Sequence, residues 1–376
     1  MRIIGIIAEY NPFHLGHAYQ IKKIKEKYKD SIIIALVNTC FTERGDISII
    51  NKWNKAQICL ENGIDLVVEF PTIYSTQSAD IFAANALKIL NELKIDTLAF
   101  GVETDNSQIF ETFADIQLNS KEYQEKVKEY LDNGLNYPTA MSKALEKITN
   151  IKIDKPNDLL ALSYIKEIKK NDYHIEPLLI KRKDNYNKII KDEKIISANQ
   201  IRLMYNNKES IEKHIVPNEI NYLYQDLTLN SLFPLLKYTI IKEDNLSDYL
   251  DISEGLENRI KKYITESDTW NDLVEKIKTK RYTYNRINRT LLHIVLNIKK
   301  EDNESTPYIR ILGFNDQGKK HLNNIKKEIK LDIYNKYKPN LNKSFDIENR
   351  CCAIYSLITK DKLIIKREYQ NRPIIK

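Results

Sequence analysis

Two histidines in the segment NPFHLGH, residues 11–17, are the side chains of this sequence best suited to catalysis. His14 and His17 are two of only six histidines and lie three residues apart. In the first turn of a helix, both imidazoles would face the same side. There they could donate hydrogen bonds to phosphate oxygens whose charge grows during attack at phosphorus. The alternative is structural, with His14 capping a helix and His17 packed against its neighbours.

The elements around this segment favour the catalytic interpretation. Short, continuously apolar runs rich in β-branched residues predict buried strands over 2–8, 31–37, 65–70 and 97–101. Helical apolar spacing separates them, as at Ile21, Ile24 and Tyr28. This alternation predicts an α/β fold with a Rossmann-like parallel sheet. The histidines follow the first strand and open the first helix, where backbone N–H groups and the helix dipole attract phosphate.

The rest of the chain changes character near residue 215. Residues 105–150 read as helical, and 173–182 as a further strand that ends at Arg182. Amphipathic helical patterns dominate afterwards, which predicts a nucleotidyltransferase-like domain over 1–220 and a mainly α-helical domain over 221–376. The apolar runs at 353–359 and 362–369 predict a small hairpin or a sheet edge.

Composition limits the class of protein. A chain of 376 residues with 42% hydrophobic and 30% charged residues is expected to fold into two soluble domains. No apolar run approaches the roughly 20 residues that cross a bilayer. The four cysteines show neither zinc-site spacing nor a disulfide framework, so we expect a cytoplasmic protein without a metal site of its own.

Four further residues could contact a nucleotide at the same sheet edge. Arg44, in the loop CFTERGD, could meet a phosphate or RNA, or pair with the acids beside it. Gly101 ends the fourth strand, where a base or ribose could approach the bare backbone. Asn157 could read an adenine edge or cap a helix. Arg182 could hold a triphosphate or form a surface salt bridge.

A basic segment over 276–300 predicts RNA binding. It contains eight Lys or Arg and no acid, and its tyrosines and arginines interleave as in surfaces that stack on bases and grip phosphates. A solvated helix face is the alternative. Lys52 and Lys55 could extend a basic surface or lie on a solvated helix face. The residues we expect to contact RNA are Arg44, Lys280, Arg281, Arg286 and Arg289.

Taken together, the segments resemble one known family. GIIAEYNPFHLGH, FTERGD, KPNDLLALSY, SANQIR and KRYTYNRINRTLLHIVL occur in the order seen in the bacterial tRNA(Met) cytidine acetate ligase family, part of the HIGH-type nucleotidyltransferase superfamily. The resemblance implies that ATP, with Mg²⁺, activates acetate as acetyl-adenylate. The acetyl group then passes to the exocyclic amine of the wobble cytidine in elongator tRNA(Met), giving N4-acetylcytidine.

The resemblance also implies a set of site residues. His14 and His17 would be catalytic. The nucleotide would contact Ile7, Ala8, Glu9, Tyr10, Asn11, Pro12, Phe13, His14, Leu15, Gly16, His17, Ala18, Tyr19, Gln20, Gly101, Asn157 and Arg182. The chain departs from the family pattern at Glu43, where glutamine is usual, and at Asn199, where threonine is common.

Two other functions remain open from the sequence. The first is a small-molecule adenylyl- or cytidylyltransferase of the same superfamily, which would not need a large basic helical domain. The second is a non-catalytic RNA-binding factor that retains the nucleotide fold. The sequence leaves the oligomeric state open.

Overall fold

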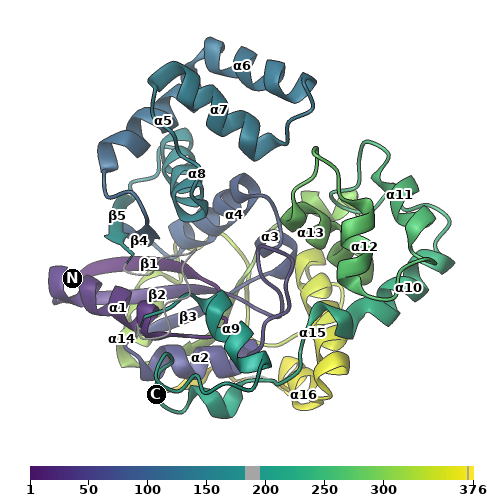
Figure 1. Ribbon diagram of the computed structural model, residues 1–376. Coiled ribbons are helices and arrows are strands. Elements are labelled where there is room, and N and C mark those ends of the chain that lie inside the picture. The colour runs from purple at the N-terminus through teal and green to yellow at the C-terminus, as the bar shows by residue number, and fades with distance from the viewer. Residues whose placement is uncertain (183–194, 371) are drawn as a thin grey trace.

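A mixed, mainly parallel sheet forms the centre of the molecule. The computed structural model describes residues 1–182, 195–370 and 372–376. In that part of the chain the strand order is β5-β4-β1-β2-β3-β6-β7, and β8 pairs with β6 (Figure 1). The parallel strands are β1 (Arg2–Ala8), β2 (Ser31–Asn38), β3 (Leu66–Phe70), β4 (Thr97–Val102) and β5 (Glu176–Lys181). The predicted Rossmann-like sheet is confirmed.

The central strand β2 shows why these apolar runs become strands. All of its residues are buried, and alternate side chains enter different cores. Ile32 and Ile34 belong to the core that includes helix α4 (Ala79–Glu92) and helix α8 (Pro156–Lys170). Ile33 and Val37 join the core that includes α1 (Leu15–Lys27) and α2 (Lys52–Glu61). Helices therefore cover both faces, so a ligand is expected beyond the carboxyl ends of the strands.

The predicted helical region after the fourth strand is confirmed. It contains α5 (Ser107–Asn119), α6 (Lys121–Asp132) and α7 (Tyr137–Thr149), which form the upper lobe in Figure 1. The short α3 (Thr72–Ser75) follows β3, and α9 (Ala198–Asn206) follows β5. Ser197 caps α9 by accepting a hydrogen bond from the N–H of Gln200.

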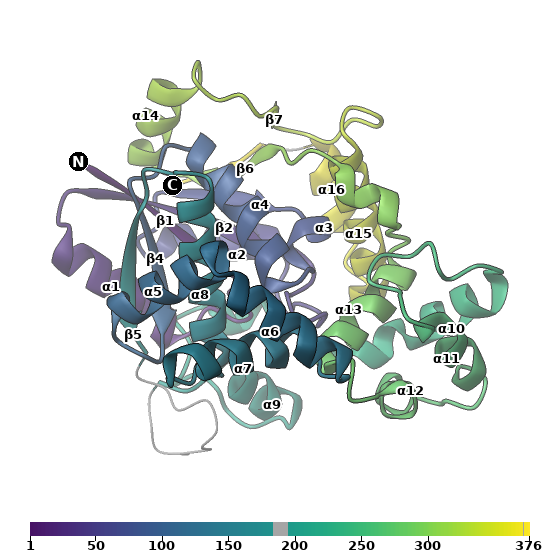
Figure 2. The same ribbon diagram turned by 90° about the horizontal axis from the view of Figure 1, so that it is seen from above.

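The later part of the chain is mainly helical, as predicted. Its elements are η1 (Glu219–Tyr222), η2 (Leu229–Leu232), α10 (Phe233–Lys242), α11 (Leu256–Tyr263), α12 (Trp270–Ile277), α13 (Tyr284–Val295), η3 (Lys300–Glu304), α14 (Asp316–Ile325), α15 (Lys343–Thr359) and α16 (Leu363–Gln370). Helices α10 to α13 form a separate lobe, and α15 lies between this lobe and the sheet (Figures 1 and 2). No helix among the described residues is long and apolar enough to span a membrane.

The chain then returns to the sheet, which the sequence did not predict. Strand β6 (Ile309–Phe314) pairs antiparallel with β3, and β7 (Ile333–Tyr334) and β8 (Ile374–Ile375) pair with β6. The boundary near residue 220 stays a prediction.

The hairpin or sheet edge expected at 353–359 and 362–369 is wrong, because these segments belong to helices α15 and α16. Burial in α15 follows helical spacing, with Ile347, Cys351 and Tyr355 each four residues apart. The β-branched residues of the run are the feature that suggested a strand. Among the described residues after α16, β8 is the segment that pairs with the sheet, through β6.

Both surface interpretations of Lys52 and Lys55 are also wrong, because each residue is only 1% exposed. The Nζ atom of Lys52 lies 2.6 Å from a carboxylate oxygen of Glu69 and 3.1 Å from one of Glu368. Lys55 donates to the carbonyl oxygens of Asn38 and Thr39 at 2.9 and 3.2 Å. Buried ammonium groups need such partners, so these lysines stabilise the interior.

Candidate active site

A cavity of about 520 Å³ lies beyond the carboxyl ends of β1, β4 and β5. Most of the predicted nucleotide residues line it, namely Ile7, Ala8, Glu9, Tyr10, Asn11, His14, Gly16, His17, Tyr19, Gln20, Gly101, Asn157 and Arg182. Pro12, Phe13, Leu15 and Ala18 are not among the lining residues. Phe13 is instead 1% exposed and packs against the rings of Tyr10 and His17.

His14 and His17 form a capping box at the start of α1. His14 Nδ1 accepts the N–H of Gly16 at 3.0 Å, and His17 Nδ1 accepts the N–H of His14 at 3.1 Å. Because each Nδ1 acts as an acceptor, the hydrogen-bond pattern assigns the proton of each neutral ring to Nε2. The two rings stack with centroids 3.8 Å apart. Both rings therefore cap the helix and line the cavity, and their catalytic role stays a prediction.

The local environment keeps His17 uncharged. Burial lowers the pKa of His17 well below its usual value, and the neighbouring His14 and Arg182 lower it further. Gly16 allows the close packing of the pair, because a Cβ atom there would lie 2.7 Å from His14 Cε1. The site therefore presents an uncharged His17, with both rings held in fixed orientations.

Residues 214–219, far away in the sequence, hold the loop that carries His14 through hydrogen bonds. The N–H of Leu15 donates to the carbonyl oxygen of His214 at 2.9 Å, and the N–H of Phe13 donates to a carboxylate oxygen of Glu219 at 2.5 Å. Burial raises the pKa of Glu219 well above its usual value. Arg202 Nη1 donates to the carbonyl oxygen of Asn11 at 2.8 Å. Sequence reasoning missed Glu219, since nothing near it resembles a site motif.

The loop over 42–46 forms another wall of the cavity. Its backbone N–H at Glu43 donates to a carboxylate oxygen of Glu9, on the segment that follows β1, at 2.8 Å. Arg289 Nη1 lies 3.1 Å from a carboxylate oxygen of Glu43, and Arg202 Nη2 lies 3.9 Å from one of Asp46. Burial raises the pKa of both Glu43 and Asp46, although the arginines oppose this shift. Two arginine–carboxylate pairs therefore lie on this side of the cavity.

The third wall combines Gly101, Asn157 and Arg182. A Cβ atom on Gly101 would lie 3.2 Å from Arg182 Cγ, so the arginine crosses the bare backbone at the end of β4. Asn157 does not cap α8, since the N-cap residue is Lys155. Its Nδ2 instead donates to a carboxylate oxygen of Glu103 at 2.5 Å, which ties α8 to the loop after β4.

The residues predicted to bind RNA divide into two groups. Arg44 and Arg289 line the cavity, whereas Lys280, Arg281 and Arg286 are absent from its lining. Lys280 and Arg281 are exposed, and Arg286 donates to Ser253 Oγ at 2.7 Å. Arg289 is only 7% exposed.

The geometry can be compared with known proteins. The family model described as HIGH Nucleotidyl Transferase matches residues 1–371. The protein named tRNA(Met) cytidine acetate ligase from Caldicellulosiruptor saccharolyticus is 36% identical over 394 residues, covering 100% of this chain and 98% of its own. The protein of that name from Staphylococcus aureus is 35% identical over 370 residues, covering 96% of each chain. This chain belongs to the tRNA(Met) cytidine acetate ligase family.

Solved structures agree with this membership. Thermotoga maritima TmcAL bound with alpha-thio ATP has a TM-score of 0.88 and 28% identity, covering 100% of this chain and 99% of its own. The apo form of that protein has a TM-score of 0.90 at the same identity and coverage. The family resemblance drawn from the sequence motifs is therefore confirmed.

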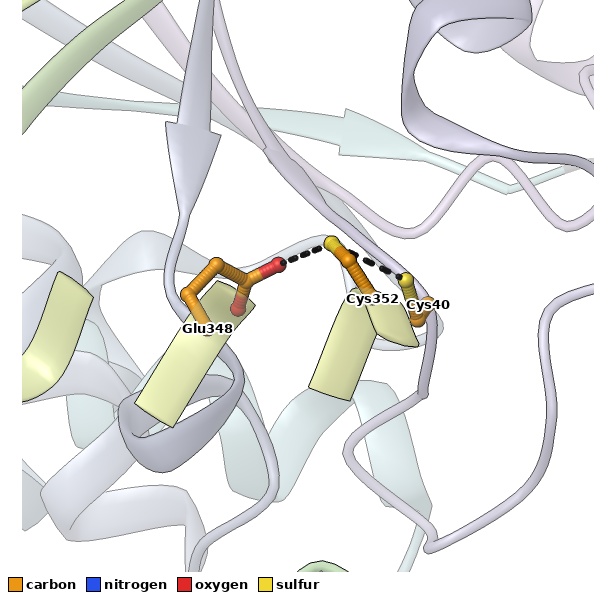
Figure 3. Close-up of side chains that lie close together, drawn as sticks. All are labelled: Cys40, Glu348 and Cys352. Carbon is orange, nitrogen blue, oxygen red and sulfur yellow. Dashed lines mark hydrogen bonds between the residues drawn. The ribbon is translucent and has the colours of Figure 1, made fainter. Parts of the chain in front are cut away.

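One cluster in this family member has the donor atoms of a metal site. Cys40 Sγ lies 3.7 Å from Cys352 Sγ, which lies 3.5 Å from a carboxylate oxygen of Glu348 (Figure 3). That same oxygen faces Lys52 Nζ at 3.6 Å, and the other accepts the N–H of Thr72 at 2.8 Å. Burial raises the pKa of the Cys352 thiol. The ammonium group of Lys52 already supplies a positive charge beside Glu348, so we interpret the cluster as part of a buried ionic network.

Proposed function

We propose that this protein is an ATP-dependent ligase that acetylates the wobble cytidine of elongator tRNA(Met), giving N4-acetylcytidine. In the first step, acetate would attack the α-phosphorus of ATP to give acetyl-adenylate and pyrophosphate. The observation that carries the proposal is the pair His14 and His17, whose Nδ1 atoms both accept backbone hydrogen bonds beside the cavity. The name of the relatives, tRNA(Met) cytidine acetate ligase, supports acetate and tRNA(Met) as the substrates.

The site suits adenylate formation because this step requires positioning and charge neutralisation more than a protein nucleophile. The Nε2–H groups of His14 and His17 would donate to phosphate oxygens as charge develops on them. Arg182 and the N-terminus of α1 would add positive potential. Since His17 stays neutral, it would hold its proton throughout rather than transfer it.

Mg²⁺ would enter with the phosphates of ATP and neutralise part of their charge. It usually binds substrate phosphates together with one or two carboxylates. Glu9 and Asp46 line the cavity and are oxygen donors of this kind. The remaining predicted contacts, such as Gly101 and Asn157, would hold the nucleoside end of ATP.

The second step brings RNA to the same cavity, where the cytosine amine attacks the acyl carbon and AMP leaves. Thr283 and Asn285, at the start of α13, line the cavity with the nucleotide residues. The basic residues of this region and of the 42–46 loop would hold the tRNA through phosphate contacts that weaken with salt. The proposed contacts are Arg44, Lys280, Arg281 and Arg286. A cytoplasmic location is part of this proposal.

Exchange of labelled pyrophosphate into ATP tests the first step without RNA. We expect exchange that depends on acetate. Exchange that requires a phosphorylated small acceptor instead would favour a small-molecule nucleotidyltransferase. Absence of nucleotide binding would favour the non-catalytic RNA-binding factor.

A further inference from the structure

Helix α13 touches the wall of the cavity directly. Gly45, in the 42–46 loop, has a φ of +82°, and a Cβ atom there would lie 2.6 Å from the backbone nitrogen of Arg289. The loop is closed by hydrogen bonds from the N–H of Thr42 to the carbonyl oxygen of Asp46 at 2.9 Å and from the N–H of Gly45 to that of Thr42 at 3.0 Å. A compact turn therefore rests on the backbone of α13.

The side chain of Arg289 ties the same two elements together. Its Nη1 contacts both the carboxylate and the carbonyl oxygen of Glu43, at 3.1 and 3.3 Å. Its Nε lies 3.7 Å from Asp251 Oδ2, in the turn before α11. A buried guanidinium between two carboxylates interacts strongly with both, because water screens the charges little.

This contact reaches residues that would face the substrates. Glu43 is held from its other side by Glu9, and both line the cavity together with Arg44. Arg286 lies one helical turn before Arg289 on α13 and is itself half-buried. Arg289, which itself lines the cavity, thus connects α13 to the 42–46 loop.

The inner end of the contact is not fully hydrogen-bonded. Arg289 Nε, Asp251 Oδ2 and His293 Nδ1 are buried and have no hydrogen-bond partner in the part of the chain that the structure describes. His293 Nδ1 lies 3.6 Å from the same Asp251 oxygen. The contact of Arg289 with Asp251 is therefore an ion pair without a hydrogen bond, whereas its contact with Glu43 includes hydrogen bonds.

We propose that Arg289 is a positioning residue for acetyl transfer, which holds the 42–46 loop against α13 through Glu43. Arg289 thereby fixes the position of the cavity residues Glu43 and Arg44 relative to RNA bound on the exposed side of α13. This role replaces direct RNA contact by Arg289, whose side chain is buried. The inference rests on the proposed function.

Steady-state acetylation of tRNA, with Arg289→Met compared with Arg286→Met, separates positioning from RNA contact. A misplacement of about 1 Å can cost about 100-fold in rate, so we expect Arg289→Met to lower kcat about 10-fold or more with little change in KM for tRNA. Arg286→Met should raise KM and leave kcat nearly unchanged. A raised KM without loss of kcat in Arg289→Met, or no effect, would overturn the proposal. If Arg289→Met does not fold, Arg289→Lys is measured in its place, and the same comparison of kcat with KM for tRNA decides the outcome.

Hydrogen exchange gives a readout that does not depend on the reaction. The amides of residues 42–46 should exchange faster in Arg289→Met than in the wild type, and should be unchanged in Arg286→Met. Unchanged exchange in both variants would refute the positioning role. If the wild type shows no acetate-dependent pyrophosphate exchange, the proposed function fails, while the amide measurement still decides whether Arg289 holds the loop.

Discussion

Replacing His17 by alanine and by asparagine should separate its two roles. Its Nδ1 accepts the N–H of His14 at 3.1 Å, while Nε2–H is the donor assigned to the phosphates. His17→Ala removes both interactions. His17→Asn keeps an acceptor near the position of Nδ1 and removes only the donor. The two variants should therefore differ in stability and agree in rate.

The magnitudes follow from these contacts. Loss of an N-cap hydrogen bond costs about 0.5 to 2 kcal/mol of stability, so His17→Ala should be destabilised by about that amount and His17→Asn by much less. Loss of one preorganised donor to a charged transition state costs about 100- to 1,000-fold in rate, or about 2.7 to 4 kcal/mol. Both variants should show this loss.

Two assays are sufficient. Acetate-dependent pyrophosphate exchange at saturating ATP and acetate measures the rate, and guanidinium unfolding measures stability. If His17→Asn exchanges pyrophosphate at nearly the wild-type rate, Nε2 has no catalytic role and the pair His14 and His17 only caps α1.

Three further predictions concern stability. Burial lowers the pKa of His17 in the native protein, so below about pH 6.5 the unfolded chain binds a proton at this residue and the native protein does not. The stability of the wild type should therefore fall relative to that of His17→Asn as the pH is lowered from about 6.5 to 5. Guanidinium unfolding should show a loss of up to about 1.4 kcal/mol per pH unit. Gly134 has a φ of +81° and nothing within 4 Å of an added Cβ, so Gly134→Ala should cost only the backbone strain, about 1 to 2 kcal/mol of stability. Gly45→Ala should cost at least about 1 kcal/mol more, because its Cβ clashes with α13. Equal losses of stability in the two variants would argue against this contact. Lys52→Met leaves buried carboxylates without their ammonium partner and should lower the free energy of unfolding by about 3 to 5 kcal/mol. As a control, Lys88→Met on the exposed face of α4 should change it by less than about 0.5 kcal/mol. A similarly small change in both variants would contradict the ionic role of Lys52.

The sequence was most informative where a pattern is local. Strands β1 to β4 are continuous β-branched runs, because each is buried on both faces, and their ends are located to within a residue or so. The position of His14 and His17 after β1 followed from the same pattern. Gly101 and Arg182 could also be placed at the sheet edge, since β4 and β5 are parallel and end together.

Features that depend on distant partners were not predictable from local patterns. Glu219 supports the histidine loop across 206 residues of chain, and Lys52 finds one of its carboxylates at Glu368. Strand β6 joins β3 only after the helical lobe. The sequence predicts Arg289 as an RNA contact because its neighbours are basic, but it gives no sign of the burial of Arg289, which depends on the fit of α13 against Gly45.

Mass analysis of the nucleosides of elongator tRNA(Met), after incubation with the protein, ATP and labelled acetate, tests the proposed function most directly. We predict labelled N4-acetylcytidine at the wobble position, formed only when both ATP and acetate are present and lost in His17→Ala. An unmodified wobble cytidine, in a reaction in which the same preparation exchanges pyrophosphate with acetate, would contradict the assignment of tRNA as the acceptor.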